Sequence, residues 1–337
     1  MTNRILLTGA GFTHNFGTPL ANEIATHISN SLEGDEGMKL KKIIREYEYD
    51  YENAYQDIIA GEYSKLEQLK MYSALSDAYK FLDNIVNNLE SEHTINLIEN
   101  ELIKNLQMNY YGSGFIFTLN QDLFIERRCR HRVDVQYCLP AANTQFLKID
   151  NINKVFDKEL CSENNDQEKI NQGKNYFLKK LDKIRNKRDS TPLIAYVKLH
   201  GSMDWISDGE NQLMVIGGNK TQYISKFPLL TWYYELFQNE LNNDNAKLLI
   251  IGYSFIDEHI NLVIKEAIEA HELKLYIINP TKQVDFEKEL ITRKFGNQIL
   301  DAISGYYPYS LKELFPNDNN QPITAQWETI KSQFFLS

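Results

Sequence analysis

Five short apolar runs, each followed at once by a glycine or a polar cluster, constrain the fold of this chain most strongly. Each run has the length and continuous hydrophobicity of a strand that is buried on both faces. Helix-like stretches separate most of the runs, and strands that alternate with helices indicate a parallel, doubly wound sheet. Because ligands bind at the carboxyl ends of strands in such sheets, we expect one crevice to collect the clusters at residues 9, 120, 200, 252 and 279.

The segments between the runs give the expected domain organisation of the 337 residues. This length suits either one large α/β domain with insertions or two domains. We interpret the chain as a Rossmann-like α/β fold with a doubly wound parallel sheet and helical insertions. Its expected parts are a nucleotide-binding core at 1–36 and 111–300, a helical insertion at 37–110, a polar insertion or lid at 141–190 and a C-terminal helical tail at 301–337.

Charge, hydrophobicity and cysteine content exclude several classes of protein. The net charge of −10 predicts repulsion from nucleic acid and from anionic membranes, and the basic run at 174–188 is interpreted as a solvated helix face. No apolar stretch approaches the roughly 20 residues that a membrane-spanning helix needs. Cys129, Cys138 and Cys161 form no C-x-x-C pair, which fits a reducing compartment. We therefore expect a cytoplasmic protein.

The first cluster, Gly9-Ala10-Gly11, offers backbone freedom and a close approach for a ligand. Successive N–H groups there can hold a pyrophosphate. A dehydrogenase fingerprint requires a third glycine, however, and His14 occupies that position. From these residues alone, a tight turn with a purely structural role remains an equal alternative.

Polar motifs follow the apolar runs in a fixed order. They are Gly9-Ala10-Gly11-Phe12-Thr13 with Gly17-Thr18-Pro19, then Thr118-Leu119-Asn120-Gln121-Asp122, Leu199-His200-Gly201, Gly252-Tyr253-Ser254 and Ile278-Asn279. In this order they resemble the motifs of the sirtuin family over residues 5–280. The resemblance implies that the crevice binds NAD and that NAD is consumed there.

The chain also departs from the protein-deacylating sirtuins. Those proteins carry a four-cysteine zinc module after the catalytic histidine, whereas this chain has no cysteine after Cys161, so no metal site and no zinc are expected. Leu20-Ala21 stands where sirtuins have Phe-Arg. The extended motifs at 200–205 and 252–261 resemble the bacterial defence-associated branch of the family. That branch implies NAD hydrolysis when phage infection is sensed, which leads to abortive infection.

The chemistry of the N-glycosidic bond suggests roles for two residues. Positive charge develops on the ribose as nicotinamide leaves, so catalysis depends on stabilising an oxocarbenium-like state. Asn120 can hold a ribose hydroxyl and an attacking water, because its amide has both donors and an acceptor. His200 can accept a proton from either group.

The resemblance implies further contacts with NAD. Asp122 would accept a hydrogen bond from the nicotinamide carboxamide, Thr13 and Ser254 would contact phosphate, and Asn279 would contact the adenosine ribose. The backbone of Gly9, Ala10, Gly11 and Gly252 would complete the NAD-binding set.

Several of these residues also have structural interpretations. Asn120 can cap a helix that begins near Gln121, and Ser254 or Asp257 can cap a later helix. His200 can be an interior histidine, and His14 can lie at the surface. Tyr51-Glu52 resembles an acidic-aromatic pair of the defence branch, but packing explains it equally well. The aromatic residues Trp232, Tyr233, Tyr234 and Phe237 are expected in a core or an interface.

Four functions remain as alternatives: an NAD glycohydrolase, a protein deacylase, a non-catalytic nucleotide-binding subunit, and an NAD cyclase or ADP-ribosyl transferase. We favour the first, acting as a gated effector. Since a constantly active NAD hydrolase would kill its host, we expect a homo-oligomer or a separate sensor protein to control it. Within this branch a HerA-type ATPase is the favoured partner, and a nucleotide-sensing subunit or a short Argonaute is also compatible.

Overall fold

A parallel β-sheet forms the centre of the protein. The computed structural model describes residues 4–90, 92–108, 113–128, 135–137, 167–186, 188, 193–206, 212–318 and 323–336. Within these ranges the sheet has the order β3-β4-β2-β1-β7-β8-β9, and each neighbouring pair is parallel. Its strands are β1 (Arg4–Thr8), β2 (Ser113–Thr118), β3 (Val135–Tyr137), β4 (Leu193–Lys198), β7 (Lys247–Ile251), β8 (Lys274–Ile278) and β9 (Ile303–Tyr307). The expected α/β fold with a doubly wound parallel sheet is therefore confirmed.

The sheet reverses its winding direction at β1. The strands β2, β4 and β3 lie on one side of it, and β7, β8 and β9 lie on the other. The last residues of five strands form one register row across the sheet, in the order Lys198, Thr118, Thr8, Ile251 and Ile278. Since the five polar clusters follow these residues, they all emerge at the same edge, next to the point where the winding reverses.

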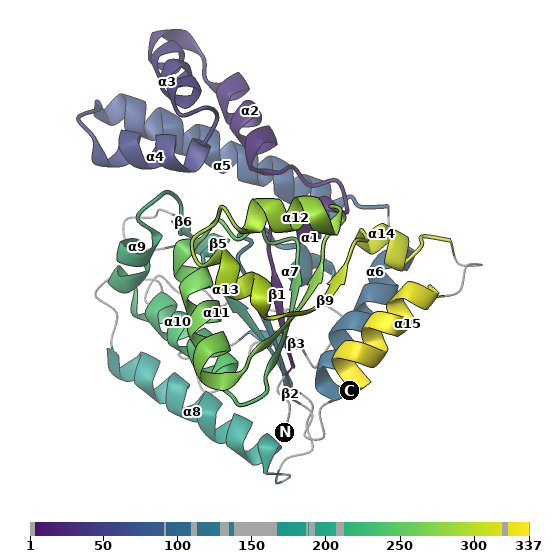
Figure 1. Cartoon of the computed structure of the whole chain (residues 1–337). Helices are drawn as coiled ribbons and strands as arrows, with labels where there is room; N and C mark the ends of the chain where they lie inside the picture. The colour runs from purple at the N-terminus through teal and green to yellow at the C-terminus, as the bar shows by residue number, and fades with distance from the viewer. Residues whose placement is uncertain are drawn as a thin grey trace.

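Four helices stand together over this carboxyl edge of the sheet (Figure 1). They are α2 (Ala21–Ser31), α3 (Gly34–Glu46), α4 (Tyr51–Ala60) and α5 (Lys65–Asn87). The longest, α5, begins at a capping box in which Ser64 and Glu67 satisfy each other's backbone N–H groups. Its buried side chains, among them Leu75 and Tyr79, recur at helical spacing. These helices lie mostly in the segment expected as a helical insertion at 37–110, and α2, which precedes it, packs against α5. The status of this segment as an insertion stays a prediction.

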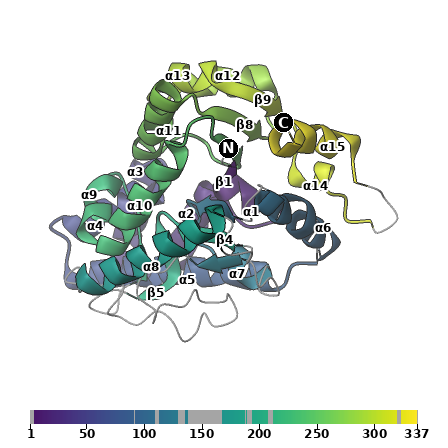
Figure 2. The same cartoon turned by 90° about the horizontal axis from the view of Figure 1, so that it is seen from below.

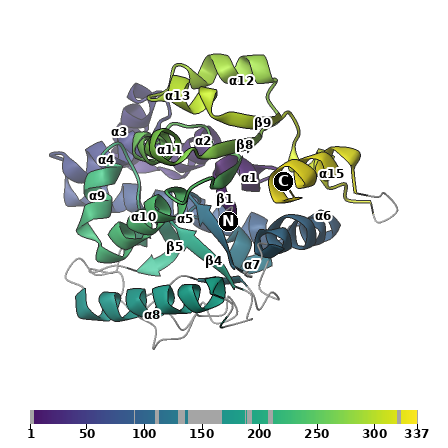
Figure 3. The same cartoon turned by 60° about the horizontal axis from the view of Figure 1, so that its bottom comes forward.

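Most of the other helices lie around the sheet (Figures 1 and 3). They are α1 (Ala10–His14), α6 (Glu92–Leu97), η1 (Ile98–Ile103), η2 (Lys104–Met108), α7 (Phe124–Arg128), α8 (Gln167–Arg185), α9 (Lys220–Lys226), α10 (Pro228–Leu241), α11 (Glu258–His271), α12 (Gln283–Leu290) and α13 (Gly296–Asp301). A two-stranded sheet, β5 (Gly201–Ile206) and β6 (Gln212–Met214), follows β4 in the chain. In α10, Trp232, Tyr233 and Phe237 are buried in the hydrophobic core.

The C-terminal segment differs from the helical tail expected at 301–337. It begins with β9, which extends the sheet beside β8, and then continues through α14 (Leu311–Leu314), α15 (Ala325–Lys331) and η6 (Ser332–Leu336). The strand was missed because its sequence, ISGYY, has a glycine in the middle and no continuous apolar run. Figures 2 and 3 show α15 beside α6, and Lys331 forms an ion pair of 2.8 Å with Glu101 of η1.

The basic run at 174–188, which is expected to form a solvated helix face, lies mostly on α8. Lys174 pairs with Glu235 at 2.6 Å, and Arg185 pairs with Glu240 at 2.6 Å, so acidic residues of α10 neutralise part of its charge. Most of the lid expected at 141–190 and all three cysteines lie outside the described residues. Within the described ranges, no helix combines the length and the apolar character that crossing a membrane requires.

Candidate functional site

The glycines of the opening loop lie against the loop that follows β7. The N–H groups of Gly9 and Gly11 donate to the carbonyl oxygens of Ile251 and Gly252, at 3.0 and 2.9 Å. Gly252 has a φ of +69°, and a Cβ atom there would lie 2.1 Å from the backbone nitrogen of Phe12. Close contact between two backbone segments therefore requires these glycines, and two of the N–H groups expected to face phosphate bond to protein instead.

Three of the predicted site residues meet where β1 and β2 end. Thr13 Oγ1 donates to Asp122 Oδ2 at 3.0 Å, and Asn120 Nδ2 lies 3.5 Å from Thr13 Oγ1. Thr13 and Asp122 are buried, whereas Asn120 is partly exposed. Asp122 Oδ1 accepts the N–H of Phe124, the first residue of α7, at 2.9 Å. Thus Asp122, and not Asn120, makes the side-chain bond at the start of this helix.

Buried charge surrounds the loop that carries Asp122. Lys198 of β4 and Glu126 of α7 form an ion pair of 2.8 Å, and both side chains are fully buried. The Lys198 ammonium also donates to the backbone oxygen of Asp122. Burial raises the pKa of Asp122, and the nearby Lys198 opposes that rise. Lys198 therefore ties the strand β4 to α7 and to the loop after β2, at the carboxyl edge of the sheet.

Gln121 was not predicted as a site residue, yet it joins this loop to the helices above it. Its Nε2 donates to the backbone oxygen of Val215 at 2.8 Å, and its Oε1 accepts from the hydroxyl of Tyr79 on α5. The Tyr79 hydroxyl lies 3.3 Å from that of Tyr51 on α4. The helical spacing of Tyr79 predicts its burial, but no local pattern predicts its partner.

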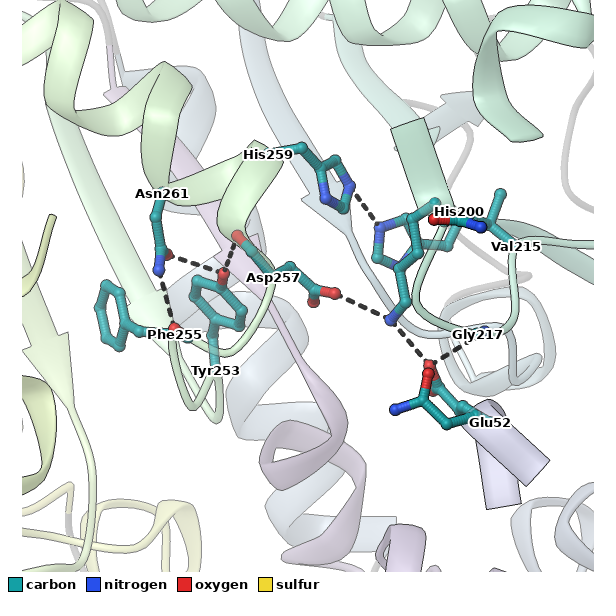
Figure 4. A network of polar contacts seen from close by, with 12 residues as sticks. Glu52, His200, Val215, Gly217, Tyr253, Phe255, Asp257, His259 and Asn261 are labelled. Carbon is teal, nitrogen blue, oxygen red and sulfur yellow. Dashed lines mark hydrogen bonds and ion pairs between the residues drawn. The ribbon is translucent and has the colours of Figure 1, made fainter. Parts of the chain in front are cut away.

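His200 lies beside His259, a second histidine that was not predicted. The two Nε2 atoms are 3.1 Å apart, and the side chains belong to the loop after β4 and to the first turn of α11 (Figure 4). Burial lowers the pKa of His200 well below its usual value, and Asp257 opposes the effect. Burial likewise lowers the pKa of His259, to about 4. Both rings are consequently neutral at pH 7.

A chain of three charges runs from these histidines to the helices over the sheet (Figure 4). Asp257 Oδ1 pairs with the Lys220 ammonium of α9 at 2.8 Å, and the same ammonium pairs with Glu52 of α4 at 2.9 Å. Asp257 precedes α11 but forms no side-chain cap on it. Burial lowers the pKa of Lys220, but the two carboxylates outweigh this and raise it overall. Glu52 of the predicted acidic-aromatic pair thus has an electrostatic partner.

Other predicted residues lie along the same edge of the sheet. Ser254 is exposed after β7, and Ala10 is exposed at the start of α1. The Asn279 side chain accepts the N–H of Thr281 at 2.9 Å, which forms a local turn after β8. His14 is exposed, and its Nδ1 lies 2.7 Å from the backbone oxygen of Thr18. Ser254 and Asn279 remain predictions as NAD contacts.

Among the described residues, His200, Asp257 and His259 form a group of metal-ligand types within 4.8 Å of one another. The Asp257 carboxylate is already neutralised by Lys220, and the spacing of the two rings fits a hydrogen bond. The Lys220 ammonium would also repel a cation. These contacts favour a hydrogen-bonded group over a metal centre, and the absence of zinc stays a prediction.

Access to the site is restricted. Thr13 and His200 are each 3% exposed and Asp122 is 6% exposed. One surface hollow of about 420 Å³ lies elsewhere, with residues of α2 and α3 in its lining, and another of about 210 Å³ lies between α8 and α10. We locate the site by its converging polar groups at the sheet edge. In this structure the three side chains therefore offer little surface to a ligand.

A family model matches part of the chain. Residues 115–300, more than half of the chain, match the family model described as a SIR2-like domain. The matched segment contains Asn120, Asp122, His200, Asp257 and His259, but it begins after the opening loop and the helices α2–α5. No curated protein matches the chain.

Proposed function

The chain belongs to the SIR2-like family, and we propose that it is an NAD glycohydrolase that releases nicotinamide and ADP-ribose. A SIR2-like domain implies an activity on NAD. The observation that carries the proposal is the meeting of Thr13, Asn120 and Asp122 at the carboxyl ends of β1 and β2. His200 follows the neighbouring strand β4 at the same edge.

The proposed reaction uses these residues in distinct roles. Asp122 binds the nicotinamide carboxamide, and Thr13 holds the Asp122 carboxylate in place. As the bond from the anomeric carbon to nicotinamide breaks, the Asn120 amide holds a ribose hydroxyl and the attacking water. His200 accepts a proton from one of these two groups, and its depressed pKa keeps the ring neutral for this task. The glycines of the opening loop and Gly252, with Ala10, Ser254 and Asn279, complete the NAD-binding surface.

We also propose that the enzyme is gated. The burial of Thr13, Asp122 and His200 supports a resting state in which NAD has poor access to the reacting groups. The contact of Tyr79 with Gln121 and the charge chain from Glu52 to Asp257 give the helices α2–α5 a physical connection to the site. The proposed role is NAD depletion during phage infection, in the cytoplasm. Control would come from a homo-oligomer or from a sensor protein such as a HerA-type ATPase.

Product analysis tests this function. The purified chain is incubated with NAD, alone and with the protein encoded by its genomic neighbour, and the products are separated by chromatography. Equal amounts of nicotinamide and ADP-ribose support hydrolysis. Cyclic ADP-ribose would identify a cyclase, and an ADP-ribosylated protein would identify a transferase. Both reactions share the release of nicotinamide with hydrolysis but use an acceptor other than water. Nicotinamide release that requires an acyl-lysine peptide would identify a deacylase.

A further inference from the structure

His259 has the geometry of a direct partner for His200. Their Nε2 atoms are 3.1 Å apart, and the ring centroids are 5.2 Å apart. His200 is 3% exposed and His259 is 9% exposed, so water competes little for this contact. The backbone of His259 is fixed as well, because the Tyr234 hydroxyl donates to its carbonyl oxygen at 2.9 Å.

Two neutral rings can form this bond in only two ways. One Nε2 atom carries the hydrogen and the other accepts it. If His259 were the donor, the hydrogen of His200 would sit on Nδ1, and His200 would have no free lone pair with which to accept a proton. If His200 is the donor, its Nδ1 is free to act as the base. The bond to His259 therefore selects between an active and an inactive tautomer of His200.

The surrounding charges offset part of the cost of placing one extra proton on this pair. Asp257 and Glu52 are negative and Lys220 between them is positive, so the chain carries one net negative charge. Asp257 raises the pKa of His200 and His259 against the effect of burial, whereas Lys220 lowers it. A proton gained by the two histidines brings the whole buried group to neutrality, which reduces the cost of holding positive charge in the interior.

We propose that His259 is the positioning residue for His200, accepting the hydrogen on His200 Nε2 and sharing the positive charge when His200 acts as a base. This inference rests on the proposed function. A proton leaves the ribose hydroxyl or the attacking water for Nδ1 of His200, and the electron pair of the O–H bond stays on oxygen. The hydrogen on His200 Nε2 then moves toward His259 Nε2, where Asp257 stabilises the charge.

The tautomers can be measured without catalysis. Imidazole ¹⁵N chemical shifts distinguish a protonated ring nitrogen from a bare one, and His200→Asn and His259→Gln assign the two signals. At pH 7 the full-length protein is expected to show His200 protonated at Nε2 and bare at Nδ1, with His259 bare at Nε2. A His200 ring protonated at Nδ1 would overturn the proposal.

Kinetics supply the second test. We expect His259→Gln to lower kcat about 10- to 100-fold while KM for NAD changes little, because the side chain does not touch substrate. Added imidazole is expected to restore part of the activity of His259→Ala. The matched control is His271→Gln, at the other end of α11, where the ring faces Asp244 near the surface; it should leave kcat unchanged.

These outcomes distinguish the catalytic role proposed for His200 from the positioning role proposed for His259. If His200→Ala retains full nicotinamide release, the catalytic role of His200 fails. If His200→Ala is inactive but His259→Gln matches wild type in kcat and in pH profile, only the positioning role fails. A His259→Gln variant with lower kcat and no imidazole rescue of His259→Ala would indicate a purely structural side chain.

Discussion

The Nε2 atoms of His200 and His259 lie 3.1 Å apart in the protein interior. This contact joins two segments that are far apart in the sequence, the loop after β4 and the first turn of α11. Burial lowers the pKa of both rings. The pair therefore links the pH dependence of stability to the site at the carboxyl edge of the sheet.

Acid should destabilise the protein through these histidines. The pKa of His259 is about 4 in the folded protein and about 6.5 when the chain unfolds, so the unfolded state binds more protons between these values. The contribution of His259 to the free energy of unfolding is therefore fully present above pH 6.5. As the pH falls toward 4, this contribution is lost, which lowers the free energy of unfolding by about 3 kcal/mol. His200 acts in the same direction.

Urea unfolding at several pH values checks this expectation. We expect His259→Gln to lose less stability than wild type between pH 7 and pH 4.5, and His271→Gln to follow wild type. Equal losses in wild type and His259→Gln would show that the buried pair does not control the acid response.

Contact between the opening loop and the loop after β7 predicts a strong effect of Gly252→Ala. The new Cβ would lie 2.1 Å from the backbone nitrogen of Phe12, so one backbone segment must shift, at a cost of more than about 4 kcal/mol. Gly17 is a matched control, since its φ is +90° but nothing lies within 4 Å of a Cβ there. Gly17→Ala should cost only the backbone strain, about 1–2 kcal/mol. Similar melting temperatures for the two variants would contradict this account of the glycines.

The buried pair of Lys198 and Glu126 should make Lys198→Met strongly destabilising. The change leaves the Glu126 carboxylate buried without its cation, which costs about 3–5 kcal/mol. The surface pair of Lys288 and Asp285, both mostly exposed, provides the control; Lys288→Met should change stability by less than about 0.5 kcal/mol. Chemical denaturation measures both, and a small effect of Lys198→Met would mean that water reaches Glu126.

Lys220→Met should alter the pH dependence of the reaction. The Lys220 charge lowers the pKa of His200 and His259, so its removal makes both rings easier to protonate. We expect the acid limb of the rate profile to move to higher pH. Lys226→Met, an exposed change on the same helix, should leave the profile in place. If the pH profile of Lys220→Met does not move, the charge of Lys220 does not influence the group that limits the rate at low pH.

Most of the central sheet can be predicted from the sequence, because the patterns that indicate its strands are local. Continuous apolar runs give most of the buried strands, and the residues that end them, such as Thr8 and Thr118, lie in one register row. The strand β9 escapes prediction because a glycine interrupts it and its stability comes from pairing with β8. Site residues that follow strands, such as Asn120 and His200, can be proposed from position and resemblance.

Contacts between distant segments are the part that the sequence leaves open. His259 and Lys220 gain their roles only when α11, α9 and α4 pack together, and no spacing within one helix reports that packing. Gly9 and Gly11 suggest a phosphate-binding loop, but their N–H groups bond to the loop after β7. Local patterns therefore predict where the site lies, whereas tertiary packing decides which groups in it are free to act.

Nicotinamide release from NAD tests the central claim most directly. Wild type, Asn120→Ala, His200→Ala and the control His271→Gln are assayed with NAD, each alone and with the protein encoded by the neighbouring gene. We predict that wild type and His271→Gln release nicotinamide and ADP-ribose at equal rates, and that Asn120→Ala and His200→Ala are at least about 100-fold slower. Wild-type turnover in both Asn120→Ala and His200→Ala would contradict the account.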